Sequence, residues 1–183
     1  RSINRGLNSD DYDALIGCGF KPMFARNVLL FPFKPIEQFP KGKRRQILRD
    51  ERLVGQLGLK WLTVGNLDSE QASRVADLYV QLYLGKYSKN NPRFTPLFHS
   101  ECSNRKILNY QLLCDGDQII GVLGMKVVDG VSTTPILGYD HNHPNANVLY
   151  RIITAKITRT CSDNNFHRHA SSGANKFKKF DII

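Results

Sequence analysis

The strongest constraint on the fold is a change of hydrophobic period in the middle of the chain. The segment DSEQASRVADLYVQLYLGKY carries its apolar residues at helical spacing, which places them on one side of a helix. From residue 107 to residue 139, the sequence ILNYQLLCDGDQIIGVLGMKVVDGVSTTPILGY instead has apolar runs separated by Asp-Gly pairs. Asp-Gly is a favoured hairpin turn. The pattern predicts three antiparallel strands, of which the middle one, QIIGVLGMKVV, is buried.

Short helices and strands are expected on both sides of this meander. In RFTPLFHSECSNR, Thr95 and Pro96 have the residue types of a helix cap and a first helical position. DHNHPNAN is expected to be a polar loop. The other expected elements are a helix in SDDYDALIGCGF, an edge strand in ARNVLLFPF, a Pro-rich connector, a basic helix in KGKRRQILRDERLVGQLG, a strand in LKWLTVGNL, a helix in NANVLYRIITAKITRTCSDN and a strand in FHRHASSGA.

The composition is that of a globular protein, and its charge suits either an anionic partner or a basic solvated surface. Apolar residues make up 41% of the 183 residues, and the net charge is +10, which favours nucleic acid, a membrane surface or a phosphorylated molecule. The four cysteines are far apart and form no CxxC pair, so neither a disulfide framework nor a zinc ribbon is expected. With no apolar run of membrane-spanning length and no signal peptide, we expect a cytoplasmic protein.

Several motifs are weighed as sites. Two H-x-H pairs, His141 with His143 and His167 with His169, have zinc-ligand residue types but no cysteine nearby, and we predict no metal. The basic helix suits phosphate contact or a solvated surface equally well. SSGANKFKK lacks the P-loop pattern; its small residues and lysines suit a phosphate or carboxylate held at backbone N–H groups, or a basic terminus.

Four motifs in this order resemble the acyl-CoA N-acyltransferase (GNAT) superfamily, in the branch of the Fem-type peptidoglycan aminoacyltransferases. They are KGKRRQILRDER, ADLYVQLYLGKYSKN, LLCDGDQIIGVLGMKVVDGVSTTPILGYD and SSGANKFKKF. The resemblance spans residues 37 to 180 and implies an α+β fold, with a mostly antiparallel central sheet flanked by helices. It departs from the superfamily at the pyrophosphate loop, R/Q-x-x-G-x-G/A, in whose place this chain has DHNHPNAN.

The resemblance implies the domain organisation and the site. Residues 37–183 form the GNAT-like domain, and residues 1–36 are the tail of a preceding segment or an N-terminal extension. Transfer of an acyl group from acyl-CoA or aminoacyl-tRNA to an amine is the implied reaction, and the basic composition also suits a nucleic acid as partner. Tyr139 and Asp140 are the implied acid or base; the implied substrate or cofactor ligands are Asn145, Gly173, Lys176 and Lys178.

Two other functions stay open at this point. The first is a non-catalytic basic module that binds RNA or another polyanion, and it follows from the charge. The second is an inactive, truncated acyltransferase. Members of the family continue with further strands after the lysine of the last motif, whereas this chain ends at Ile183.

Overall fold

The predicted meander forms the middle of the sheet. The computed structural model describes residues 9–21, 28–87, 89 and 91–171, and the meander consists of β3 (Asn109–Asp115), β4 (Gln118–Val128) and β5 (Val131–Tyr139). Each strand pairs antiparallel with the next. At the second turn, Asp129 and Gly130 both have positive φ, 49° and 74°, as a type I′ hairpin turn requires.

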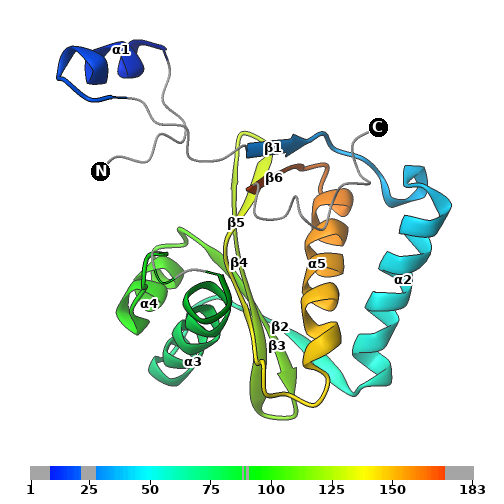
Figure 1. The fold of residues 1–183 in the computed structure, drawn as a ribbon. Helices are drawn as coiled ribbons and strands as arrows, with labels where there is room; N and C mark the ends of the chain where they lie inside the picture. The colour runs from blue at the N-terminus through cyan, green and yellow to red at the C-terminus, as the bar shows by residue number, and fades with distance from the viewer. Residues whose placement is uncertain (1–8, 22–27, 88, 90, 172–183) are drawn as a thin grey trace. The chain divides into compact units, whose positions relative to one another are not determined.

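Three further strands extend the meander to a six-stranded sheet of order β1-β6-β5-β4-β3-β2 (Figure 1). The strands are β1 (Val28–Phe31), β2 (Leu59–Val64) and β6 (His167–Ser171). β2 pairs antiparallel with β3, whereas β6 runs parallel to β5. The parallel pair needs a crossover connection, and helix α5 (Ala146–Asp163) provides it.

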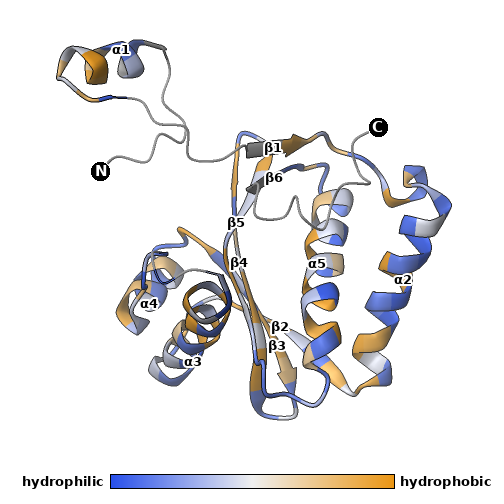
Figure 2. Cartoon of the chain, in the orientation of Figure 1, coloured by the Kyte–Doolittle hydropathy of each residue, from blue (hydrophilic) through white to orange (hydrophobic). Residues whose placement is uncertain are grey.

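Helices cover both faces of the sheet. α3 (Ser69–Val80) and α4 (Pro96–Asn104) lie on one face, while α5 and α2 (Lys41–Gln56) lie on the other (Figure 1). Successive side chains along each strand point to opposite faces of the sheet, so the strands contribute to two hydrophobic cores. Leu112, Val122 and Ile136 pack toward α3, whereas their neighbours Leu113, Leu123 and Leu137 pack toward α5. In Figure 2 the apolar sides of the helices accordingly face the sheet.

Local sequence signals set the helix boundaries. The Asp68 carboxylate accepts a hydrogen bond from the Gln71 N–H, and the Asp68 N–H donates one to the Gln71 side-chain oxygen, which is a complete capping box. Thr95 caps α4 with Pro96 in its first turn, as the sequence predicts. A 3-10 turn, Ile36–Gln38, occupies part of the Pro-rich connector.

The chain divides into two compact units, residues 1–28 with 171–183, and residues 29–170. The first contains helix α1 (Ser9–Gly17). The second contains α2 to α5, the meander and the candidate site described below. Among the described residues, no helix is both long and apolar enough to cross a membrane.

Candidate functional site

The candidate site is an open hollow where β5 ends. Two adjoining cavities, of about 330 and 460 Å³, make up this hollow, and both are lined by Lys86 and His141. We call it the β5-end hollow. Its remaining lining residues are Gln81, Gly85, Tyr139, Asn142, Ala146 and Asn147. It therefore collects side chains from the end of a strand, the loop after it, the start of α5 and the segment after α3.

That last segment departs from the sequence prediction. The helical spacing of DSEQASRVADLYVQLYLGKY predicts one α-helix, but α3 ends at Val80 and continues as a π-helical turn, η2 (Gln81–Tyr87). In an α-helix, residues five apart point about 140° away from each other. The i→i+5 pattern of a π-helix brings them closer to the same side. Gln81 and Lys86 are five apart, and both line the β5-end hollow.

Tyr139 is the sheet residue of the site. Its side chain is buried in the core between the sheet and α5, and it contributes to the lining of the hollow. The Lys86 ammonium donates a hydrogen bond to the Tyr139 hydroxyl oxygen over 3.1 Å. This hydrogen bond raises the pKa of Lys86 more than its slight burial lowers it. Lys86 therefore stands beside the Tyr139 oxygen as a cation.

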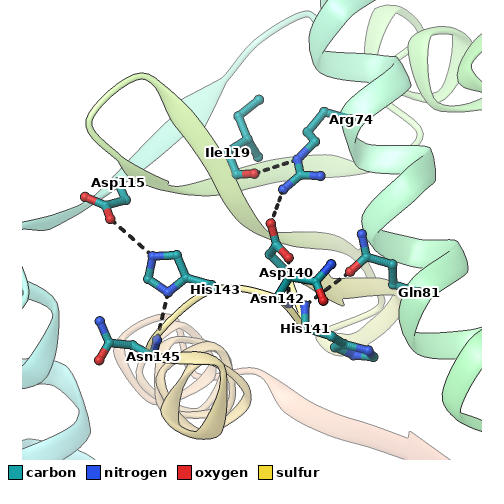
Figure 3. Close-up of polar contacts among 9 residues, drawn as sticks. All are labelled: Arg74, Gln81, Asp115, Ile119, Asp140, His141, Asn142, His143 and Asn145. Carbon is teal, nitrogen blue, oxygen red and sulfur yellow. Dashed lines mark hydrogen bonds and ion pairs between the residues drawn. The ribbon is translucent and has the colours of Figure 1, made fainter.

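His141 lines both cavities and carries a buried polar atom without a partner among the described residues. Its backbone N–H donates to the Gln81 side-chain oxygen over 3.1 Å (Figure 3), and its ring lies 4.6 Å from that of Tyr139, centroid to centroid. The Nε2 atom is buried and has no hydrogen-bond partner in the described part of the chain. Burial first, and then the charge of Lys86, lower the pKa of His141. Its imidazole is therefore neutral at physiological pH.

Asp140, the other predicted catalytic residue, is held in an ion pair. Arg74 Nη2 lies 2.6 Å from its carboxylate, while Arg74 Nε donates to the Ile119 carbonyl oxygen over 2.8 Å (Figure 3). The Asn142 N–H donates to the second carboxylate oxygen over 2.9 Å. Burial alone would raise the pKa of Asp140, but the hydrogen bonds from Asn142 and Arg74 lower it overall. Asp140 therefore anchors the loop as a carboxylate.

Asn145, a predicted ligand residue, lies at the N-terminal cap of α5. Its backbone N–H donates to His143 Nδ1 over 3.2 Å, and His143 Nε2 lies 3.1 Å from the Asp115 carboxylate (Figure 3). Because Nδ1 accepts a hydrogen bond, the hydrogen of the ring is on Nε2, which donates to the Asp115 carboxylate. This chain of contacts attaches the loop to the end of β3.

The structure separates the two H-x-H pairs. His167 and His169 lie opposite Val131 and Thr133, at the start of β5, whereas His141 and His143 follow its end. The six residue-to-residue steps from Thr133 to Tyr139 span about 20 Å of strand. In the part of the chain that the structure describes, no group of three His, Cys, Asp or Glu residues could hold a metal ion.

The structure thus brings Tyr139, Asp140 and Asn145 to one end of β5. Gly173, Lys176 and Lys178 lie outside the described residues, and their binding role stays a prediction. The sequence analysis missed Lys86, His141 and Gln81 as residues of this site. A signal existed only for His141, which belongs to an H-x-H pair; Lys86 and Gln81 lie in a segment with ordinary helical spacing.

No family model and no curated protein matches this sequence. Solved structures do match. L-PGS from Bacillus licheniformis superimposes with a TM-score of 0.51 at 9% identity, over 88% of this chain and 49% of that one. A conserved protein of unknown function from Bacteroides thetaiotaomicron VPI-5482 gives a TM-score of 0.59 at 10% identity, over 93% of this chain and 62% of that one.

A third match is the C-terminal domain (DUF2156) of a putative lysylphosphatidylglycerol synthetase from Agrobacterium fabrum. Its TM-score is 0.53 at 11% identity, over 82% of this chain and 49% of that one. At such identities the likeness is one of fold. The predicted fold class is confirmed: a GNAT-like α+β fold with a mostly antiparallel open sheet flanked by helices. The chain spans between 49% and 62% of the length of these three structures.

Proposed function

We propose that this domain transfers an acyl or aminoacyl group to an amine, and that the reaction takes place in the β5-end hollow. One observation carries the proposal: two residues line the same hollow, Tyr139, whose hydroxyl is hydrogen-bonded to Lys86 at 3.1 Å, and His141, whose buried Nε2 has no partner among the described residues. A proton donor and a proton acceptor on adjacent rings are what acyl transfer to an amine needs from a protein.

The roles follow from the protonation states. The acceptor amine attacks the donor carbonyl, so that a carbon–nitrogen bond forms and the bond to the leaving sulfur or oxygen breaks. Neutral His141 takes the proton that the amine must lose. The Tyr139 hydroxyl gives its proton to the leaving atom, and the ammonium of Lys86 stabilises the negative charge left on the Tyr139 oxygen. His141 then releases its proton to solvent, and Tyr139 takes one up from solvent.

Asp140 has a positioning role in this proposal. Its carboxylate is engaged by Arg74 and by the Asn142 N–H, and the pKa of Asp140 lies below its usual range. A carboxylate with these partners is a weak base. It fixes the loop that carries His141, and Asn145 at the start of α5 continues the same support.

The donor that we propose is acyl-CoA or aminoacyl-tRNA, both anionic, in keeping with the net charge of +10. Two of the similar structures, L-PGS and the DUF2156 domain, carry the name of a lysylphosphatidylglycerol synthetase or its abbreviation. Transfer of an aminoacyl group is the reading nearest to that name, and it agrees with the predicted Fem-type branch. Gly173, Lys176 and Lys178 shape and charge the donor pocket in this proposal.

The test is product formation by the full chain from a radiolabelled acyl-CoA or aminoacyl-tRNA with a panel of amines. Tyr139→Phe keeps the buried ring and removes only the hydroxyl. We expect kcat to fall about 100-fold or more, the usual contribution of general acid–base catalysis. Tyr150→Phe is the matched control, because its ring lies 6.2 Å from that of Tyr139 but outside the hollow.

A double-mutant cycle tests whether Lys86 acts through Tyr139 or independently of it. Lys86→Met should lower kcat in the wild-type background but change it little in Tyr139→Phe. Additive losses would remove Lys86 from this role. Equal activity of Tyr139→Phe and Tyr150→Phe would overturn the assignment of Tyr139. Binding of the donor should weaken in Lys178→Ala; unchanged binding would remove Lys178 from the donor pocket.

A further inference from the structure

Helix α2 presents a row of cations to solvent. Lys41, Arg45, Arg49 and Arg52 follow each other at intervals of four, four and three residues, so they fall within an arc of about 80° on the helix. All four are exposed. The buried residues of α2, Ile47 and Asp50, lie on the opposite side. We call this row the α2 stripe; it is about 16 Å long at 1.5 Å per residue.

The acidic residues of α2 do not neutralise the stripe, because α5 engages them. The carboxylate of Asp50 is buried and pairs with the Arg151 guanidinium. Glu51 receives two hydrogen bonds from Arg159, of 2.7 and 2.9 Å. Only Arg49 has a contact back toward them, at 3.8 Å from Asp50. Interhelical packing thus turns the acids inward and leaves the cations outside.

The geometry points to a phosphate backbone as the partner of this surface. We propose that the α2 stripe binds the backbone of a double-helical nucleic acid, independently of any reaction in the β5-end hollow. A straight row of four cations matches a row of phosphates in charge, and three of the four are arginines, whose planar guanidinium suits phosphate oxygens.

Two other polyanions fit less well. A helix that lies in a membrane interface buries apolar side chains there. None of the exposed large apolar residues belongs to α2, which the structure describes throughout, and Figure 2 shows this helix as mostly hydrophilic. Single-stranded nucleic acid is held by stacking on aromatic rings, and α2 contains no aromatic residue. A duplex backbone requires neither feature.

The experiment measures fluorescence anisotropy of a labelled duplex of about 20 base pairs, as RNA and as DNA, titrated with the full chain. Each phosphate contact contributes about −0.9 to the slope of log K against log salt. Four contacts predict a fall in affinity of about 150-fold between about 50 and 200 mM salt. Arg45→Gln/Arg49→Gln should reduce this fall to about 12-fold and weaken binding at low salt.

A control variant that loses the same charge shows whether binding depends on the α2 stripe or on the overall charge of the protein. Lys60→Gln/Arg93→Gln removes two exposed cations outside α2 and should leave the slope within about 0.5 of the wild-type value. Thermal unfolding checks that both variants fold. Equal effects of the two variants would overturn the proposal. So would binding to vesicles of phosphatidylglycerol and phosphatidylcholine without binding to either duplex. Tighter binding of one duplex shows whether the partner is RNA or DNA, and binding of either duplex through the α2 stripe supports the proposal.

Discussion

The backbone of Leu78 in α3 occupies the space in which a side chain on Gly138 of β5 would lie. A Cβ atom on Gly138 would stand 2.5 Å from the Leu78 carbonyl carbon and 2.8 Å from the Tyr79 nitrogen, closer than non-bonded atoms approach. The glycine therefore lets α3 pack directly on β5, one residue before Tyr139. This close approach also sets the start of η2 against the end of the strand.

Gly138→Ala should accordingly destabilise the protein. The clash is with backbone, which cannot rotate away, so we expect a loss of about 3 kcal/mol, at the upper end of overpacking effects. Urea unfolding measures it. Gly65→Ala is the control: a Cβ there meets nothing within 4 Å, and its effect should stay below about 0.5 kcal/mol. Equal unfolding midpoints for the two variants would contradict the packing argument.

The pH dependence of activity should report His141. Burial, followed by the charge of Lys86, lowers the pKa of His141 from 6.5, and a base acts only when unprotonated. The acid limb of kcat/KM should therefore lie below pH 6.5. Lys86→Met removes the second cause, so the limb should move to higher pH, toward 6.5. Lys89→Met, at an exposed lysine three residues further along the chain that does not line the hollow, should leave it in place. A limb that moves to lower pH in Lys86→Met would exclude His141 as the titrating group.

His99 should make stability fall in mild acid. It is fully buried among aromatic rings, with Nδ1 2.9 Å from the Tyr110 hydroxyl, and burial lowers the pKa of His99 to about 4. Between pH 6.5 and about 4 the unfolded chain therefore binds a proton that the folded chain does not. The contribution of His99 to the free energy of unfolding is therefore fully present above pH 6.5. About 3 kcal/mol of it is lost as the pH falls to about 4.

His99→Gln isolates this contribution, because glutamine can still accept a hydrogen bond from Tyr110 and does not titrate. Urea unfolding of the two proteins at several pH values gives the difference between their curves. That difference should shrink steadily as the pH falls from 6.5, since only the wild type loses the His99 contribution. Parallel curves would show that His99 titrates normally.

The two acids of α2 should differ in their contribution to stability. The Asp50 side chain is 4% exposed and that of its partner Arg151 is 36% exposed, whereas Glu51 and Arg159 are 28% and 30% exposed. Loss of the more buried carboxylate leaves Arg151 poorly paired, so Asp50→Ala should cost about 2 kcal/mol. Glu51→Ala should cost about 1 kcal/mol or less. Thermal or urea unfolding ranks them, and the reverse order would contradict the role of burial.

The similarity in fold to the three solved structures and the sequence motifs lead to the same architecture. The motifs predicted a GNAT-like fold from short patterns, each weak alone. The superposition reaches the same fold at 9% to 11% identity. Such agreement is expected at low identity, because a fold depends on element order and burial pattern, which very different sequences share.

The sequence by itself determined the elements whose causes are local. Asp129-Gly130 supplies the positive φ values of its turn, Thr95 and Pro96 begin α4, and alternation along β3 to β5 selects the face of each side chain. These features depend on residues only a few positions apart, so their physical causes are visible in the sequence.

Tertiary structure decided the site. Lys86 and Tyr139 are 53 residues apart, and the π-helical turn that brings Lys86 to the hollow breaks the spacing from which an α-helix is predicted. The lowered pKa of His141 depends on burial by other elements and on the charge of Lys86. Such contacts exist only once α3 lies on Gly138, because distance and burial between remote residues are properties of the packed chain.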